Sequence, residues 1–146
     1  MPYYIKRKNK KAHSGSNGAK TRARKKPDLV KKLDRVFSLY IRLRDTMPGG
    51  YVVDCGHFHS RRHMATRFSE DNAHAECRFC NRFSADHLIG YERNLIRKIG
   101  RQKFDLLNVK AHSACHYLDC ELEEMIRHYT LEVKKLSTLK GIKVHL

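Results

Sequence analysis

The residues whose types and spacing can do chemistry gather in the middle of the chain, between residues 53 and 84. Asp54, His57 and His59 lie within six residues at the end of a predicted strand, and they supply one carboxylate and two imidazoles. An imidazole can take a proton from an attacking water, and a carboxylate is a preferred ligand of hard cations such as Mg²⁺. These residue types are those of a metal-dependent nuclease.

Two cysteines follow in the same segment. Cys77 and Cys80 form a Cys-x-x-Cys knuckle, whose spacing lets both thiolates reach one tetrahedral zinc. Asn81 comes next, so a rigid knuckle would aim its side chain at a fixed point. Two ligands alone hold zinc poorly, and without zinc we expect both cysteines to be small buried packing residues. The residues left to complete a zinc site are Cys55, His74, His112, Cys115, His116 and Cys120.

The order of these residues resembles the HNH, or ββα-metal, nuclease motif, with His57, Asn72 and Asn81 at its three positions. Phage endonuclease VII, a Holliday-junction resolvase, has the same Cys-x-x-Cys-Asn ending. The sequence is more closely similar to the lambda NinG family, also called Rap, over roughly residues 33–136. This similarity is carried by Asp54-x-Gly56-His57-Phe58, Arg67-Phe68, Asn72, Cys77-x-x-Cys80-Asn81 and Tyr91.

The resemblance implies a structure-selective endonuclease of phage recombination, which cuts branched DNA such as Holliday junctions and D-loops. It implies that His57 is the general base of catalysis, and that Asn81 and Asp54 hold one Mg²⁺ or Mn²⁺ at the scissile phosphate. It also implies that Asn72 supports catalysis by hydrogen-bonding across the hairpin loop and fixing the backbone of His57.

Two departures from the family pattern affect these assignments. In the endonuclease VII pattern an acid directly precedes the catalytic His, whereas here Gly56 does, and Asp54 lies three residues back. Because positions three apart face opposite sides of a regular strand, we expect Gly56 to permit a bulge that brings Asp54 and His57 together. Otherwise His59, on the same face as His57, is the better metal ligand. Family members usually also carry an earlier Cys-x-x-Cys, which is absent here, so a four-Cys zinc site within this region is not available.

The charge of the chain indicates a polyanionic partner. Lys and Arg number 31 against 15 Asp and Glu, and ten of these basic residues precede Pro27 with no acid among them. We expect residues 1–27 to be a flexible, disordered basic arm that follows phosphates without reading sequence, or else a solubilising or subunit-docking tail. Arg61, Arg62 and Arg67 are predicted phosphate contacts, because guanidinium groups clamp phosphate at two points. The predicted DNA contacts of the arm are Lys6, Arg7, Lys8, Lys10, Lys11, Arg22, Arg24, Lys25 and Lys26.

Apolar spacing predicts the elements that position these residues. Pro27 and Asp28 mark a helix start, and Pro48 to Gly50 mark its end. The expected elements are a helix over 29–45, a strand from 51 into Asp54, a helix over 88–99, a short helix around 104–107 and a helix over 119–136. The expected fold is α+β, with a ββα-metal hairpin and helix packed among about four α-helices in a domain of residues 28–146.

Composition excludes several other classes of protein. With 40% hydrophobic residues, 7 Tyr and 6 Phe, the chain has enough material for a core, so it is not wholly disordered. No apolar run reaches membrane-spanning length, and the charged first residues precede no hydrophobic segment, so we expect neither a membrane protein nor a secretory signal. We therefore expect a protein of the bacterial host cytoplasm, where the five thiols stay reduced.

Two other functions fit the same features. One is a noncatalytic basic module that binds DNA or RNA, and the other is a general HNH nicking endonuclease that cuts linear duplex as readily as junctions. Because resolving a junction requires two symmetric cuts, we expect a homodimer, with its interface on the apolar stripe of residues 29–41 or on the last helix.

Overall fold

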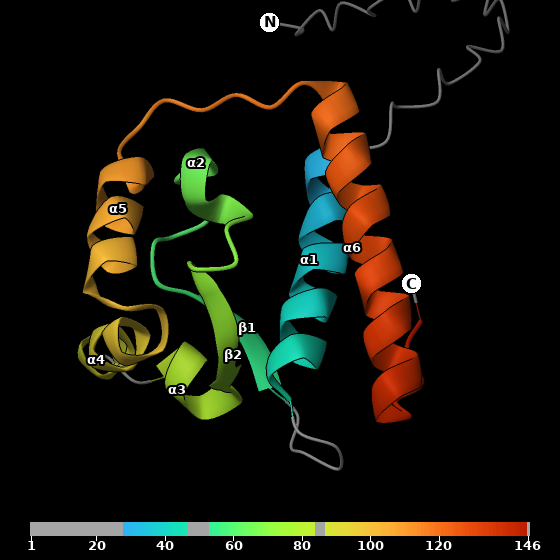
Figure 1. The fold of residues 1–146 in the computed structure, drawn as a ribbon, viewed down its shortest axis with the longest axis horizontal. Helices are drawn as coiled ribbons and strands as arrows, with labels where there is room; N and C mark the ends of the chain where they lie inside the picture. The colour runs from blue at the N-terminus through green and yellow to red at the C-terminus, as the bar shows by residue number, and fades with distance from the viewer. Residues whose placement is uncertain (1–27, 47–52, 84–86, 146) are drawn as a thin grey trace, which may run out of the picture.

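The computed structural model describes residues 28–46, 53–83 and 87–145. The predicted arm of residues 1–27 and the predicted strand residues Tyr51 and Val52 lie outside them. Within these ranges the fold combines helices with one small antiparallel sheet, in the order α1 (Leu29–Asp45), β1 (Val53–His57), α2 (Met64–Arg67), β2 (Ala73–Cys77), α3 (Arg78–Phe83), α4 (His87–Ile99), α5 (Arg101–Ala111) and α6 (Asp119–Lys140). Figure 1 shows the two strands between the α1–α6 pair on one side and α4 and α5 on the other.

The larger core lies between α1 and α6. Asp28 caps α1 as expected, since its Oδ1 accepts a hydrogen bond from the backbone N–H of Lys31 at 3.1 Å. The apolar stripes of the two helices bury one another, and the rings of Phe37 and Tyr129 lie 5.0 Å apart. The stripe of α1 is therefore buried within the chain, so the expectation that it supplies a dimer interface is wrong.

Lys140 fixes the opposite end of this helix pair. Its Nζ donates to the carbonyl oxygens of Leu43 at 2.5 Å and Thr46 at 2.6 Å, at the C-terminal end of α1. These carbonyls have no partner within the helix, and a cation also opposes the negative end of the helix dipole. The last helix consequently runs to Lys140 rather than ending near residue 136.

The strands β1 and β2 pair antiparallel in an unbroken register, from Val53 opposite Cys77 to His57 opposite Ala73. The predicted bulge at Gly56 is therefore wrong. Gly56 is buried, and a Cβ added to it would lie 1.7 Å from Oε2 of Glu76, so the glycine makes room for a side chain of the next strand. The helix α3 begins directly after β2, and the short helix α2 lies between the two strands along the chain.

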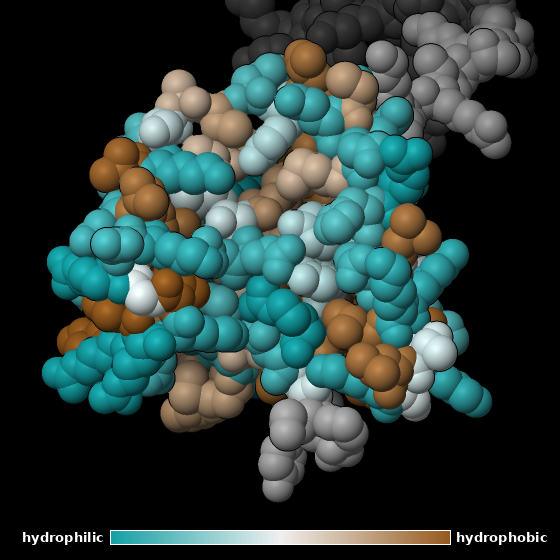
Figure 2. All heavy atoms as spheres, in the orientation of Figure 1, coloured by the Kyte–Doolittle hydropathy of each residue, from teal (hydrophilic) through white to brown (hydrophobic). Residues whose placement is uncertain are grey.

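A second core cluster lies between α4 and α5, where Tyr91, Leu95, Phe104 and Leu107 are buried together. Gly100, with φ of +85°, ends α4 and allows α5 to begin at the next residue. The short helix expected around 104–107 is thus an 11-residue helix. Of the six helices in the described ranges, α1, α4, α5 and α6 are the four expected around the strands, α3 follows β2, and only the short α2 was not expected. Figure 2 shows the molecule from the same side as Figure 1. Hydrophilic side chains cover most of this face, and hydrophobic ones lie in separate patches.

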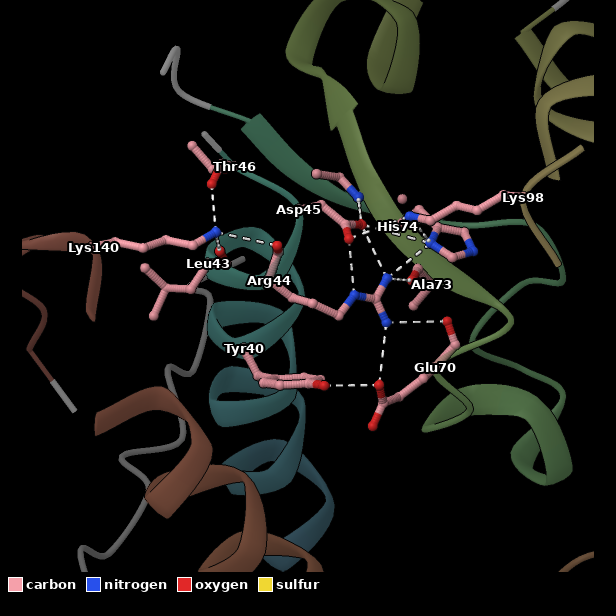
Figure 3. Close-up of polar contacts among 12 residues, drawn as sticks. Tyr40, Leu43, Arg44, Asp45, Thr46, Glu70, Ala73, His74, Lys98 and Lys140 are labelled. Carbon is pink, nitrogen blue, oxygen red and sulfur yellow. Dashed lines mark hydrogen bonds and ion pairs between the residues drawn. The ribbon is translucent and has the colours of Figure 1, made fainter. Parts of the chain in front are cut away.

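A polar network joins the end of α1 to β2 and α4 (Figure 3). Arg44 donates to both carboxylate oxygens of Asp45, at 2.8 and 3.0 Å, and also to the carbonyl and the carboxylate of Glu70. Its Nη2 lies 2.8 Å from Nδ1 of His74, and Nζ of Lys98 lies 2.9 Å from the same nitrogen. The network therefore fixes the C-terminal turn of α1 against the sheet.

Asp45 remains ionised at the centre of this network. Burial alone would raise the pKa of Asp45, but neighbouring His74, Arg44 and the backbone N–H of Ala75 favour the carboxylate and hold the pKa far below its usual value.

The described helices include none that is both long and apolar enough to cross a membrane.

Candidate active site

A cavity of about 620 Å³ opens where α1, β1, the loop after β1 and α3 meet. Its lining includes the three residues predicted from the sequence to act together in catalysis: Asp54, His57 and Asn81. The full lining is Ser38, Arg42, Asp54, Cys55, His57, Ser60, Arg61 and Asn81. The cavity is therefore mostly polar, and it holds one carboxylate, one imidazole, one amide and two guanidinium groups.

Asp54 and His57 reach this cavity from one regular strand. Although the register has no bulge, both side chains line the same space. At the other end of the cavity, Asn81 comes from α3, and Nε of Arg78 in that helix lies 3.6 Å from Oδ1 of Asp54.

His57 is held through one of its two ring nitrogens. Its Nε2 lies 3.1 Å from the carbonyl oxygen of Arg67. Since a carbonyl only accepts, Nε2 carries the proton of the neutral ring and Nδ1 is the nitrogen able to take one up. Burial lowers the pKa of His57, and the charge of Arg61 lowers it further, while hydrogen bonding to the backbone of Arg67 and Cys55 and the charge of Asp34 oppose this. The imidazole is therefore neutral near pH 7, as a general base must be.

The three arginines of the loop region take different places. Arg61 and Arg62 are both exposed, and only Arg61 lines the cavity. Arg67 instead pairs with Asp34 of α1, with its Nε at 3.0 Å and its Nη2 at 2.5 Å from the two carboxylate oxygens, and its Nη1 donates to the carbonyl of Arg61. The guanidinium of Arg67 thus anchors the loop that carries the hydrogen-bond acceptor of His57.

Asn72 is fully buried and ties the loop together. Its Oδ1 accepts from the backbone N–H of His59 at 2.8 Å, and its Nδ2 donates to the carbonyls of His59 and Thr66, both at 3.0 Å. The carbonyl of Asn72 accepts from the N–H of Phe58. These bonds cross the loop, and they fix the two residues after His57 rather than His57 itself.

His59, the alternative metal ligand, lies away from the cavity. Its Nε2 bonds to Oδ1 of Asn108 at 2.8 Å, and its ring lies 5.9 Å from that of His63 and 6.3 Å from that of His112. For a strand without a bulge, the sequence predicts His59 rather than Asp54 as the metal ligand beside His57. The structure brings Asp54 to the cavity and leaves His59 between β1 and α5.

Cys77 and Cys80 are both exposed, so the expectation that they are buried packing residues in the absence of zinc is wrong. The backbone N–H of Cys80 donates to Sγ of Cys77 at 3.0 Å, and hydrogen bonds from the side chain and backbone of Cys80 lower the pKa of Cys77. Both thiols line a second cavity of about 440 Å³, together with His74.

The donor sets differ in how well they suit a metal. Within the described part of the chain, no group of three or more His, Cys, Asp and Glu is arranged to hold a metal ion. The cysteine pair therefore lacks the third and fourth ligands of a structural zinc site there. The oxygen donors of Asp54 and Asn81 fit Mg²⁺ better, because Mg²⁺ uses one or two protein oxygens and fills its other positions with water and phosphate.

Three residues of the cavity lining, namely Ser38, Arg42 and Ser60, were not predicted from the sequence. Ser38 and Arg42 belong to α1, whose apolar stripe predicts the buried face of the helix but not a polar site beside it. They are four residues apart, so they share one face of the helix, and Nε of Arg42 donates to the carbonyl of Ser38 at 3.3 Å. This polar pair beside a core stripe was the available signal.

Comparison with known proteins identifies the family. No curated protein and no solved structure matches the chain. The family model described as the bacteriophage lambda NinG protein matches residues 4–139. Since this match spans most of the sequence, the chain belongs to the NinG family of phage recombination-related proteins.

Proposed function

We propose that this protein is a metal-dependent endonuclease that hydrolyses phosphodiester bonds in branched DNA during phage recombination. The observation that carries the proposal is the shared cavity of Asp54, His57 and Asn81. These residues supply a base and two oxygen ligands in the order of the HNH motif. The preference for Holliday junctions and D-loops rests on the family resemblance.

His57 acts as the general base. Its Nδ1 takes a proton from a water whose oxygen attacks the scissile phosphorus, while Nε2–H keeps its bond to the carbonyl of Arg67. This bond fixes the ring and also stabilises the imidazolium that forms. The bond from phosphorus to the 3′ oxygen breaks, and the leaving oxygen takes up a proton from solvent.

Asp54 and Asn81 are the residues that would hold Mg²⁺ or Mn²⁺. When bound there, the cation supplies positive charge that stabilises the developing charge on the phosphate and the leaving oxygen. The described residues support a structural zinc less well, because only Cys77 and Cys80 are suitably paired.

DNA is the proposed partner, and the host cytoplasm is the proposed location. Arg61 contacts phosphate at the cavity, while the basic residues of the arm, which lie outside the described ranges, supply salt-sensitive affinity. We also propose a homodimer with its interface on α6, where Leu131 and Leu139 are exposed. The molecular mass of the protein in solution, measured by light scattering, tests this.

Cleavage of a labelled four-way junction tests the proposal. With Mg²⁺, we expect the wild-type protein to make paired nicks near the crossover, and His57→Ala to abolish cutting while leaving binding intact. His128→Ala is the matched control, because His128 is an exposed imidazole on α6, and it should cut normally. Binding without cutting would overturn the proposal in favour of a noncatalytic module. Equal cutting of linear duplex would identify a general nicking endonuclease.

A further inference from the structure

Two arginines of the cavity have no acidic partner among the residues that the structure describes. Among the described residues, no carboxylate lies within ion-pair distance of Arg42 or Arg61. Other arginines in the same part of the chain do form such pairs, namely Arg44, Arg67, Arg78, Arg101 and Arg127. Arg42 is also half-buried, and a charge removed from water without a counterion is costly. An anion bound in the cavity would offset that cost.

The two guanidinium groups converge from different elements. Arg42 comes from α1, where the carbonyl of Ser38 holds its Nε, and Arg61 comes from the loop after β1. Cys55 lines the same cavity. Burial raises the pKa of its thiol, while a hydrogen bond with Ser38 and the charges of Arg42 and Arg61 oppose that rise. Both arginines therefore contribute positive charge to one cavity.

The sign of the lining favours a phosphate. Asp54 is its single acidic residue among those described, and this carboxylate is already near Arg78. With His57 neutral, the positive charges of Arg42 and Arg61 exceed the negative charge of Asp54. A guanidinium donates two parallel hydrogen bonds to phosphate oxygens, which suits a phosphodiester placed between the two arginines.

We infer that Arg42 and Arg61 form a phosphate clamp, which holds one phosphodiester of the DNA in the cavity beside His57. The inference rests on the proposed function in taking DNA as the occupant. It assigns a substrate-binding role to α1, which lies outside the strand, strand and helix unit that carries the motif. Arg42 therefore sets where the DNA backbone sits relative to the base.

The dinucleotide dTpT tests the clamp, because it carries a single phosphodiester. We would titrate it into metal-free full-length protein and follow the imidazole resonances of His57 by NMR, assigned with His57→Ala. The wild-type resonances should shift. Arg42→Ala should raise the Kd for this shift about tenfold or more, since a charge-assisted hydrogen bond is lost.

Arg35→Ala is the matched control, because Arg35 is an exposed arginine on the same helix and does not line the cavity. It should bind dTpT as the wild type does. Arg42→Gln keeps most of the side-chain stem and should weaken binding similarly, which guards against misfolding of Arg42→Ala. An unchanged Kd in Arg42→Gln, or no shift in the wild type, would overturn the clamp. Neither measurement requires cleavage, so failure of the nuclease proposal would be seen separately.

Discussion

Arg67 links Asp34 to His57. Its guanidinium is held by the carboxylate of Asp34, while its carbonyl accepts a hydrogen bond from the imidazole of His57. We expect Asp34→Ala to lower the single-turnover cleavage rate at saturating junction about tenfold with an unchanged KM, because a misplaced base slows chemistry without weakening binding. Asp105→Ala removes an exposed ion pair on α5 and should have no effect. A normal rate in the Asp34 variant would show that the loop needs no anchor.

The pH dependence of cleavage should report His57. Because burial lowers its pKa below the usual 6.5, the base is already neutral at pH 7. We expect the rate to be constant above pH 7 and to fall only as the pH drops through the lowered pKa, where the ring becomes protonated. Single-turnover rates between pH 5 and 9 measure this. A rate still rising steeply between pH 7 and 8 would contradict it.

Asp45→Asn should destabilise the fold by about 3 kcal/mol, because it leaves the guanidinium of Arg44 without its closest counterion inside a largely buried network. Urea unfolding measures this. The folded pKa of Asp45 is lowered, so its contribution is present above about pH 4, where the carboxyl is ionised in the unfolded chain, and is lost as the pH falls.

The matched control for Asp45 is again an exposed pair. Asp105→Asn should cost at most about 0.5 kcal/mol, because solvent screens its attraction to Arg101. Equal losses of unfolding free energy in the two variants would show that the network of Arg44 adds nothing beyond a surface ion pair.

Gly56→Ala should destabilise the protein, because the new methyl group would meet the carboxylate of Glu76. If this contact is the cause, Glu76→Ala should relieve most of the loss, and the double variant should be more stable than the sum of the two single effects predicts. Thermal unfolding of the four proteins completes the cycle. If the two single effects on stability are strictly additive, the loss in Gly56→Ala comes from the backbone at residue 56 and not from contact with Glu76.

The cysteines should differ sharply in reactivity. Burial raises the pKa of Cys55 to about 11, whereas Cys77 is exposed and its pKa is lowered by hydrogen bonds from Cys80. At pH 7.5 we expect iodoacetamide to label Cys77 well before Cys55, since the thiolate is the reactive form. Mass spectrometry of peptides measures the order.

Metal analysis accompanies this labelling. If Cys77 reacts only after EDTA has removed one zinc per chain, the prediction of a freely reactive thiol is wrong. In that case ligands beyond the described residues, or a second copy of the chain, would complete the zinc site.

Local signals predicted the elements and the motif residues well. Asp28, as a residue type that caps helices, predicted the start of α1, and the capping hydrogen bond is present. The order of Asp54, His57 and Asn81 indicated a common site, and all three line one cavity. These features depend on neighbouring residues or on a motif, so sequence alone contains them.

Features that depend on packing between distant segments were not predictable. Gly56 is needed for a side chain from β2, which only the strand register reveals. Arg42 reaches the cavity because α1 packs beside β1; its spacing from Ser38 marks a polar face of α1 but does not reveal which strand that face meets. The full length of α5 was missed because much of its surface, including Leu106 and Val109, is exposed and blurs the apolar stripe.

The packing of α1 on α6 has a consequence for protein synthesis. These helices are separated by more than seventy residues, and Lys140 reaches back to the end of α1. A nascent chain therefore cannot complete its larger core until α6 has left the ribosome. We expect chains that stop before α6 to leave the apolar stripe of α1 uncovered.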